Sequence, residues 1–260
     1  MELREKRGLP GSVLKWIAIV TMLIDHVAVV LVYGWAKYRH AWGVGIESLN
    51  FYYVLRGIGR LGFPLFCFLL AEGFVHTRSR WKYLLRLFVF ALISEIPFDR
   101  AFWSGWVDMG HQNVFFTLSF GLLAIMLWDW LTQSNAPDCP PWRGIAAIGC
   151  ATALGAAAHY METDYGAMGV ALILVMVLLR DKPLTRDLVA GGVLAAMIPF
   201  GSHWIELLGV LAFPLFHLYN GQRGRQSKYF FYVFYPAHLY FFAYLKTRPE
   251  LVRRLLSFIS

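Results

Sequence analysis

The chain has 260 residues, of which 58% are hydrophobic, 17% aromatic and only 15% charged, and its mean hydropathy is +0.52. A soluble domain of this length would carry about 25% charged residues. Because the low charge extends along the whole chain, the composition excludes an ordinary soluble enzyme. It indicates a single all-α domain over residues 1–260, a polytopic transmembrane bundle of about nine to ten membrane helices.

The formal net charge of +8 does not indicate nucleic-acid binding, because Lys and Arg lie in short loops between apolar runs, where they determine topology. The three cysteines form no C-x-x-C pair and no spacing with histidine that is typical of a metal site. We therefore expect no metal and no disulfide framework. Motifs of serine hydrolases, zinc proteases, P-loop proteins and dinucleotide-binding domains are also missing from the sequence.

The N-terminal residues 1–13 are basic and precede an apolar run at residues 14–33. This run is longer than the apolar core of a cleaved signal peptide and can span a hydrocarbon core of about 30 Å. We expect a retained first membrane helix that follows a cytoplasmic N-terminus.

Asp25 and His26 stand side by side inside this first run. A charged side chain at the centre of a membrane helix costs roughly 2.5–3.5 kcal/mol on insertion scales, so such residues usually serve a function. Neighbouring helical residues point about 100° apart. We expect Asp25 to bond a neighbouring helix and His26 to face a cavity, as a general base or a transient acyl acceptor.

Apolar runs bounded by charged or turn residues predict the other helices at about 61–77, 81–99, 113–132, 144–160, 166–180, 186–201, 203–219 and 228–245. The aromatic stretch 34–60 could lie at the membrane interface or contain a tenth membrane span. Residues 246–260 could form an interfacial amphipathic helix.

Two acidic residues, Glu72 and Glu95, lie within predicted membrane helices. Each could pair with Arg60 or Arg86 for structural reasons. The alternative for Glu72 is that it orients or charges His26.

The turn after the helix predicted at 61–77 is strongly basic, with Arg78, Arg80, Lys82 and Arg86. These residues could anchor the loop on the cytoplasmic side. They could also bind a phosphate-bearing cytoplasmic donor, since Arg offers bidentate geometry and Lys a point charge.

Two further polar residues fall in apolar helices. Asn113 begins the helix predicted at 113–132, and His238 follows Pro236 inside the last one. Either residue could contact a substrate or be a packed polar group.

Loop charges predict the orientation. The N-terminus and the loops at 78–82, 180–186 and 221–228 are rich in Lys and Arg, whereas the loop at 161–164 is acidic. The positive-inside rule therefore favours a cytoplasmic N-terminus in an inner membrane.

Six segments together resemble the TraX family of conjugal-transfer membrane proteins. They are "LKWIAIVTMLIDHV", "RGIGRLGFPLFCFLLAEGFVHT", "YLLRLFVFALISEIPFD", "QNVFFTLSFGLL", "DYGAMGV" and "FYVFYPAHL". The resemblance implies acetylation of the N-terminus of a conjugative pilin subunit with acetyl-CoA as donor, in the bacterial inner membrane. The expected partners are then the pilin and membrane lipid, with no nucleic acid.

The chain is also distantly similar to polytopic membrane acyltransferases, many of which carry Arg and His separated by ten residues on their first helix. Lys15 and His26 have this separation, although Lys keeps the charge and loses the bidentate geometry. This similarity implies that His26 is catalytic, with Asp25 or Glu72 holding its tautomer, and that Lys15 assists the basic turn in binding the donor.

The sequence leaves other functions open. Intramembrane Asp, Glu and His residues are also typical of proton-coupled transporters, although no internal repeat supports that reading. A non-catalytic pilin assembly factor, or another maturation step such as processing or cyclisation of pilin, would fit the same segments.

Overall fold

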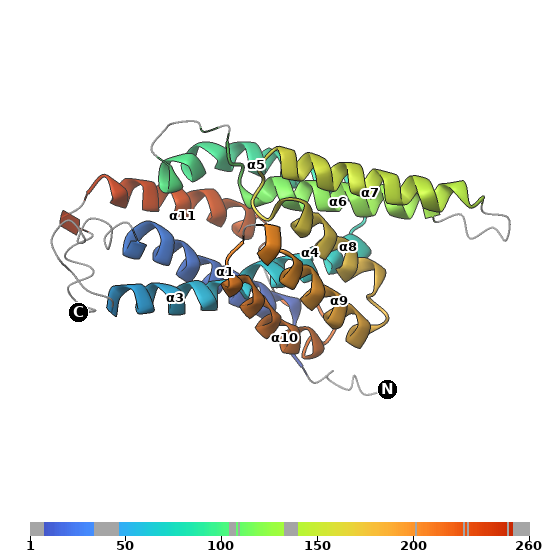
Figure 1. The fold of residues 1–260 in the computed structure, drawn as a ribbon, viewed down its shortest axis with the longest axis horizontal. Coiled ribbons are helices and arrows are strands. Elements are labelled where there is room, and N and C mark those ends of the chain that lie inside the picture. The colour runs from blue at the N-terminus through green and yellow to red at the C-terminus, as the bar shows by residue number, and fades with distance from the viewer. Residues whose placement is uncertain are drawn as a thin grey trace.

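The computed structural model describes residues 8–33, 47–103, 108, 110–132, 140–200, 202–225, 227, 229–248 and 250–251. Within these ranges the chain is helical, and its only β pairings are two isolated bridges, Leu9 with Tyr219 and Gln112 with Thr163. The prediction of an all-α bundle is therefore confirmed (Figure 1).

The first helix, α1 (Gly11–His26), continues directly as a π-helix, η1 (Val27–Tyr33). The remaining elements are α3 (Glu47–Gly59), α4 (Gly62–His76), α5 (Arg80–Phe102), α6 (Val114–Thr132), α7 (Trp142–Tyr160), α8 (Gly166–Leu178), α9 (Pro183–Ala196), the 3₁₀ helices η2 (Ile198–Phe200) and η3 (Trp204–Ala212), α10 (Phe213–His217) and α11 (Phe230–Lys246).

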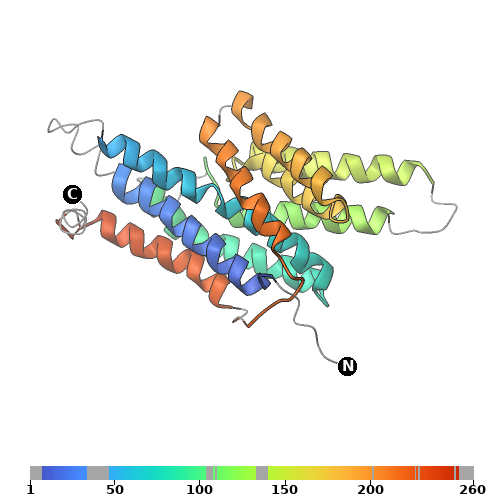
Figure 2. The same cartoon turned by 90° about the horizontal axis from the view of Figure 1, so that it is seen from below.

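The helices form two neighbouring groups (Figures 1 and 2). In one group α1 lies between α3 and α11, and α11 packs along α5. In the other, α6 packs against α7 and α8, while α9 packs against α8 and η3. Helix α4 contacts both α1 and α8 and so joins the two groups.

Three stretches of the described residues are long and apolar enough to cross a membrane, namely Gly11–Tyr33, Asn50–His76 and Val114–Thr132. Two shorter apolar stretches are Gly166–Leu178 and Trp204–His217. The span at Asn50–His76 combines α3 and α4, so part of the predicted aromatic stretch 34–60 belongs to a long, interrupted helix.

The prediction of one continuous helix at 203–219 is wrong in detail, because this segment is the 3₁₀ helix η3 followed by α10. Pro214 near the start of α10 has no N–H and so cannot bond to a carbonyl of the preceding turn. Other predictions fall partly outside the described residues: the basic segment at 1–7, the stretch at 34–46, and residues 252–260 of the predicted C-terminal helix.

Local signals explain several helix boundaries. Ser79 caps α5 by accepting a hydrogen bond from the backbone N–H of Lys82 at 3.4 Å. Pro183 opens α9, where a missing N–H costs nothing. The turn between α7 and α8 requires positive φ at Tyr165 (66°) and Gly166 (46°), and it turns the chain back on itself beside α6.

Candidate functional site

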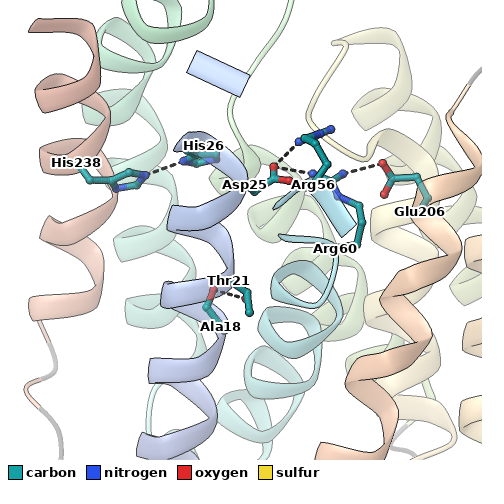
Figure 3. Close-up of polar contacts among 8 residues, drawn as sticks. All are labelled: Ala18, Thr21, Asp25, His26, Arg56, Arg60, Glu206 and His238. Atoms are coloured by element: carbon teal, nitrogen blue, oxygen red, sulfur yellow. Dashed lines mark hydrogen bonds and ion pairs between the residues drawn. The ribbon is translucent and has the colours of Figure 1, made fainter. Parts of the chain in front are cut away.

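His26, the last residue of α1, pairs with His238 of α11 (Figure 3). Nδ1 of His26 lies 2.7 Å from Nε2 of His238, and the two rings are nearly parallel, with an interplanar angle of 11°. His26 is only 9% exposed. The π-helix η1 begins at the next residue, and such segments often occur at functional sites.

The hydrogen bonds fix the tautomer of the neutral pair. Nδ1 of His238 lies 2.8 Å from the carbonyl oxygen of Phe234, which can only accept, so this nitrogen donates. Nε2 of a neutral His238 must then accept, and Nδ1 of His26 must donate to it. Nε2 of His26 therefore keeps its lone pair, as a general base requires.

Aromatic side chains surround the histidine pair. The ring centroid of Phe102, the last residue of α5, lies 5.2 Å from that of His26, and the ring centroid of Tyr235 lies 6.1 Å away. Both rings meet the imidazole edge to face. The imidazole of His26 is thus flanked by aromatic rings from α5 and α11.

Asp25 points to the opposite side of α1 from His26, toward α3 and η3 (Figure 3). Its Oδ2 accepts hydrogen bonds from Arg56 at 2.5 Å and from Arg60 at 2.6 Å. Arg60 also donates to Glu206 of η3 at 2.7 Å. We call these four residues the charge hub. It links α1, the α3–α4 junction and η3, and all its members except Arg56 are at least nine-tenths buried.

Asp164, in the turn between α7 and α8, lies within electrostatic range of all four hub residues. Desolvation by the surrounding protein atoms raises the pKa of this carboxyl to about 6, although the residue as a whole is exposed and the Arg60 and Arg56 guanidinium groups oppose the shift. The hub is tightly packed, since a Cβ added to Gly59 would overlap the Asp25 side chain.

A basic cavity of about 710 Å³ opens at the other end of α1. It lies between the start of α1, the α4–α5 turn and the loop before α11. The described part of its lining contains one acid, Glu72, which is already bonded to Arg180. The basic side chains of its lining are Lys15, Arg78, Lys82, Arg86 and Arg223.

An apolar cavity of about 100 Å³ adjoins the basic cavity. The two share Lys15, Leu69, Tyr83 and Tyr232 in their linings. The apolar cavity is also lined by Ile19 and Met22 of α1 and by Tyr235 of α11. Tyr235 contacts the ring of His26, so the apolar cavity reaches a neighbour of the histidine pair, although His26 itself lines neither of these two cavities.

The structure separates Arg80 from the predicted donor-binding group. Arg80 bonds to Asp129 of α6, and its guanidinium lies 4.1 Å from the ring centroid of Phe74. Lys82 and Arg86 are four residues apart and share one face of α5, whereas a residue two positions before Lys82 points to the opposite face. Arg80 is therefore a link between helices.

The expectation that Glu72 holds the tautomer of His26 is also corrected. Glu72 accepts a hydrogen bond from Arg180 at 2.9 Å and lies 3.4 Å from Nε2 of His76. It sits near the end of α4, and because α4 runs antiparallel to α1, this end lies beside Lys15. Asp25 does not bond the imidazole either, since the partner of His26 is His238.

Glu95 and Asn113 join α5 to the start of α6. The Asn113 side chain donates to Glu95 and, at 2.8 Å, to the carbonyl oxygen of Ala91, and its Oδ1 accepts from the backbone of Phe115. Asn113 therefore caps α6 while holding one oxygen of Glu95. Neither of the predicted arginine partners, Arg60 and Arg86, forms an ion pair with Glu95 among the described residues.

Three residues of these charged clusters were not predicted from the sequence, namely Arg56, Glu206 and Arg180. Arg56 and Arg60 have the i, i+4 spacing that places two side chains on one helical face. Glu206 is an acid within the apolar stretch Trp204–His217, and this signal alone marks an intramembrane polar site. In the described part of the chain, no group of three metal-ligating side chains is close enough to hold a metal ion.

The fold and these buried polar groups define the class: an integral membrane protein of the helical type with a polar centre inside its bundle. The family model described as TraX protein matches residues 10–246, and the chain belongs to this family. It is also 33% identical over 251 residues to the probable fimbrial assembly protein FimC, serogroup H1, of Dichelobacter nodosus, covering 87% of this chain and 91% of that protein. No solved structure matches the chain.

Proposed function

We propose that this protein is a membrane acetyltransferase that moves an acetyl group from cytoplasmic acetyl-CoA to the N-terminal amine of a pilin subunit. The observation that carries the proposal is the pair of adjoining cavities, one basic and one apolar, of which the apolar one is lined by Tyr235, a neighbour of the paired histidines. The TraX family and the fimbrial assembly relative support a role in pilus assembly and a pilin as acceptor.

The basic cavity suits the phosphate groups of the donor. Among the described residues of its lining, the only acid is already bonded to Arg180, so these residues carry an excess of positive charge. Guanidinium groups bind phosphate in bidentate fashion, and Lys15 and Lys82 add point charges. A phosphorylated ligand would offset this charge.

The apolar cavity suits the arm that carries the thioester. Leu69, Ile19 and Met22 offer no competing hydrogen bonds to an apolar chain. Tyr235, which lines this cavity and contacts His26, marks the place where the acetyl group would arrive.

His26 would then act as the general base. Its Nε2 takes a proton from the acceptor amine as the nitrogen forms a bond to the acetyl carbon. The carbon–sulfur bond of the thioester breaks, and the sulfur leaves as a thiolate that receives the proton from His26. His238 holds the imidazole in the tautomer that leaves Nε2 free.

The proposed orientation follows from where the basic turns lie. The start of α1, the α4–α5 turn and the loop before α11 all line the basic cavity, and Arg180 at the end of α8 reaches Glu72 in the same lining. The positive-inside rule makes this the cytoplasmic end of an inner-membrane protein. The acceptor amine would then approach from the other end.

Donor binding tests the first step. We expect the triple change Arg78→Gln, Lys82→Gln and Arg86→Gln to weaken the binding of acetyl-CoA to detergent-purified protein, measured by calorimetry. Arg80→Gln is the matched control, because Arg80 lies in the same basic turn but outside the cavity. Unchanged donor affinity in the triple variant would contradict the donor site.

Transfer itself is tested with His26→Ala and His26→Gln. General base catalysis contributes typically 10²–10⁴-fold, so both variants should lose at least about 10²-fold in acetylation of pilin, followed by mass spectrometry, while still binding acetyl-CoA. A cognate pilin that is assembled normally but never acetylated would instead make this protein a non-catalytic assembly factor.

A further inference from the structure

Glu95 and Asp99 form a second acidic pair, on α5 and outside the charge hub. They are four residues apart, and Phe102 follows three residues later, so all three lie along one face of the helix. Asp99 is completely buried and Glu95 partly buried. Phe102 packs against the ring of His26, and this face of α5 therefore leads to the histidine pair.

Each carboxylate has one bonded and one unbonded oxygen. Oδ2 of Asp99 accepts from the backbone N–H of Asp108 at 2.8 Å, whereas its Oδ1 is buried without a hydrogen-bond partner. Glu95 bonds Asn113 through Oε2, and its Oε1 is likewise buried and unpartnered. Among the described residues, the donors that reach the pair are neutral amides, so they do not balance a negative charge.

Buried acceptors without donors are costly, by about 1–3 kcal/mol for a neutral group and more for a charged one. A fully buried carboxylate oxygen that accepts no hydrogen bond has unused acceptor capacity. We therefore expect a ligand that donates hydrogen bonds to it. Two such oxygens one helical turn apart suit a primary amine or ammonium group, which carries up to three N–H donors.

The pair also lies at the level of His26. His26 is 15 residues beyond Gly11, where α1 begins, and Glu95 is 15 residues beyond Arg80, where α5 begins. At 1.5 Å per residue, each lies about 22 Å from the cytoplasmic start of its helix. Tyr235, beside His26, is within electrostatic range of Glu95.

We infer that Glu95 and Asp99 bind the amino group of the acceptor beside His26, an inference that rests on the proposed acetyl transfer. An amine that arrives as ammonium gives its extra proton to one carboxylate of the pair, which becomes a carboxylic acid. The neutral amine then has a lone pair for the acetyl carbon and an N–H proton for Nε2 of His26. The pair thus selects amines over alcohols as acceptors.

A binding experiment tests this site without enzymatic turnover. Hexylamine and 1-hexanol carry the same apolar chain and differ in the amino group. We expect hexylamine at neutral pH to raise the Tm of the detergent-purified protein by several degrees more than hexanol. Glu95→Gln with Asp99→Asn should abolish that difference, because both changes keep an accepting oxygen for Asn113 and Asp108 while removing the charge. Asp181→Asn, at an exposed carboxylate, is the control and should leave the difference intact.

An equal response to hexylamine in the double variant and the native protein would overturn the site. Equal responses of the native protein to hexylamine and hexanol would overturn it too.

Steady-state kinetics separates this inference from the proposed function. In the double variant the KM for an N-terminal acceptor peptide should rise at least about tenfold, while the affinity for acetyl-CoA stays unchanged. If His26→Ala is inactive but the double variant has normal acceptor KM, the amine site is wrong and the acetyltransferase stands. If the native protein acetylates no amine, the proposed function fails, and the hexylamine response then decides the binding site alone.

Discussion

The two clusters of charge near the ends of α1 are built in opposite ways. In the charge hub, Asp25 and Glu206 alternate with Arg56 and Arg60, and the ion pairs join three elements. In the basic cavity, cations gather around open space and the one acid is already bonded. Balanced buried charge therefore holds helices together, whereas unbalanced charge beside a cavity is available to a ligand.

Removing Arg60 should have the largest effect on stability. Breaking a buried pair leaves an uncompensated charge and typically costs about 3–5 kcal/mol. Arg60→Met should therefore strongly lower the Tm of the detergent-purified protein, and removing the stranded carboxylates as well, with Asp25→Leu and Glu206→Leu, should restore part of it. A Tm within one degree of the native value in Arg60→Met would mean that the hub does not stabilise the bundle.

Asp164 should make the stability depend on pH. Its folded pKa of about 6 lies above the ordinary value of 3.8, so between these values the folded state binds more protons than the unfolded state. Stability is then fully present below about pH 4 and falls as pH rises to about 6, by less than about 3 kcal/mol, because Asp164 is exposed and solvent screens its charge. Thermal unfolding between pH 4 and 7 should show this fall in the native protein and a flatter profile in Asp164→Asn. If Tm falls equally with pH in the native protein and in Asp164→Asn, groups other than Asp164 cause the pH dependence.

Gly59 tests how closely the α3–α4 junction approaches Asp25. A methyl group there would overlap the Asp25 side chain, and overpacking typically costs about 1–3 kcal/mol. Gly192→Ala is the matched control: it lies in α9, a Cβ would meet nothing within 4 Å, and the change should be neutral or stabilising. Thermal unfolding should show a lower Tm than that of the native protein for Gly59→Ala and an equal or higher Tm for Gly192→Ala. A Gly59→Ala protein as stable as the control would refute the tight approach.

Arg80→Gln should have the smallest effect. The ion pair of Arg80 with Asp129 is partly exposed, with the two side chains 36% and 24% exposed, and such pairs contribute about 0–1 kcal/mol. We therefore expect a small decrease in Tm and no change in the affinity for acetyl-CoA. A loss of donor affinity like that of the triple variant would place Arg80 in the donor site after all.

Much of the fold follows from local pattern. The run at 14–33 coincides with the span Gly11–Tyr33, and Ser79 and Pro183 begin helices for reasons that the sequence carries. The divergence of Asp25 and His26 also follows from the 100° between neighbouring helical residues. The partners of these side chains could not be predicted from the sequence, because helical spacing determines the direction of a side chain but not which helix it contacts.

Glu72 and His238 illustrate that limit. Both are polar residues in apolar helices, and the sequence gives no reason to prefer one over the other as the partner of His26. The antiparallel packing of α4 on α1 carries Glu72 to the basic cavity, while α11 brings His238 to within 2.7 Å of His26.

Hydropathy, charge and helical period are local properties of the chain, so the membrane class, the helical architecture, the basic turn and the polar pair Asp25 and His26 inside the first helix could be predicted from the sequence. Tertiary packing was needed to show that Arg80 bonds Asp129, that Arg60 links Asp25 to Glu206, and that the apolar cavity reaches Tyr235 beside His26. Those outcomes depend on which helices become neighbours, and contacts between residues as far apart as Arg60 and Glu206 are set by packing the whole bundle.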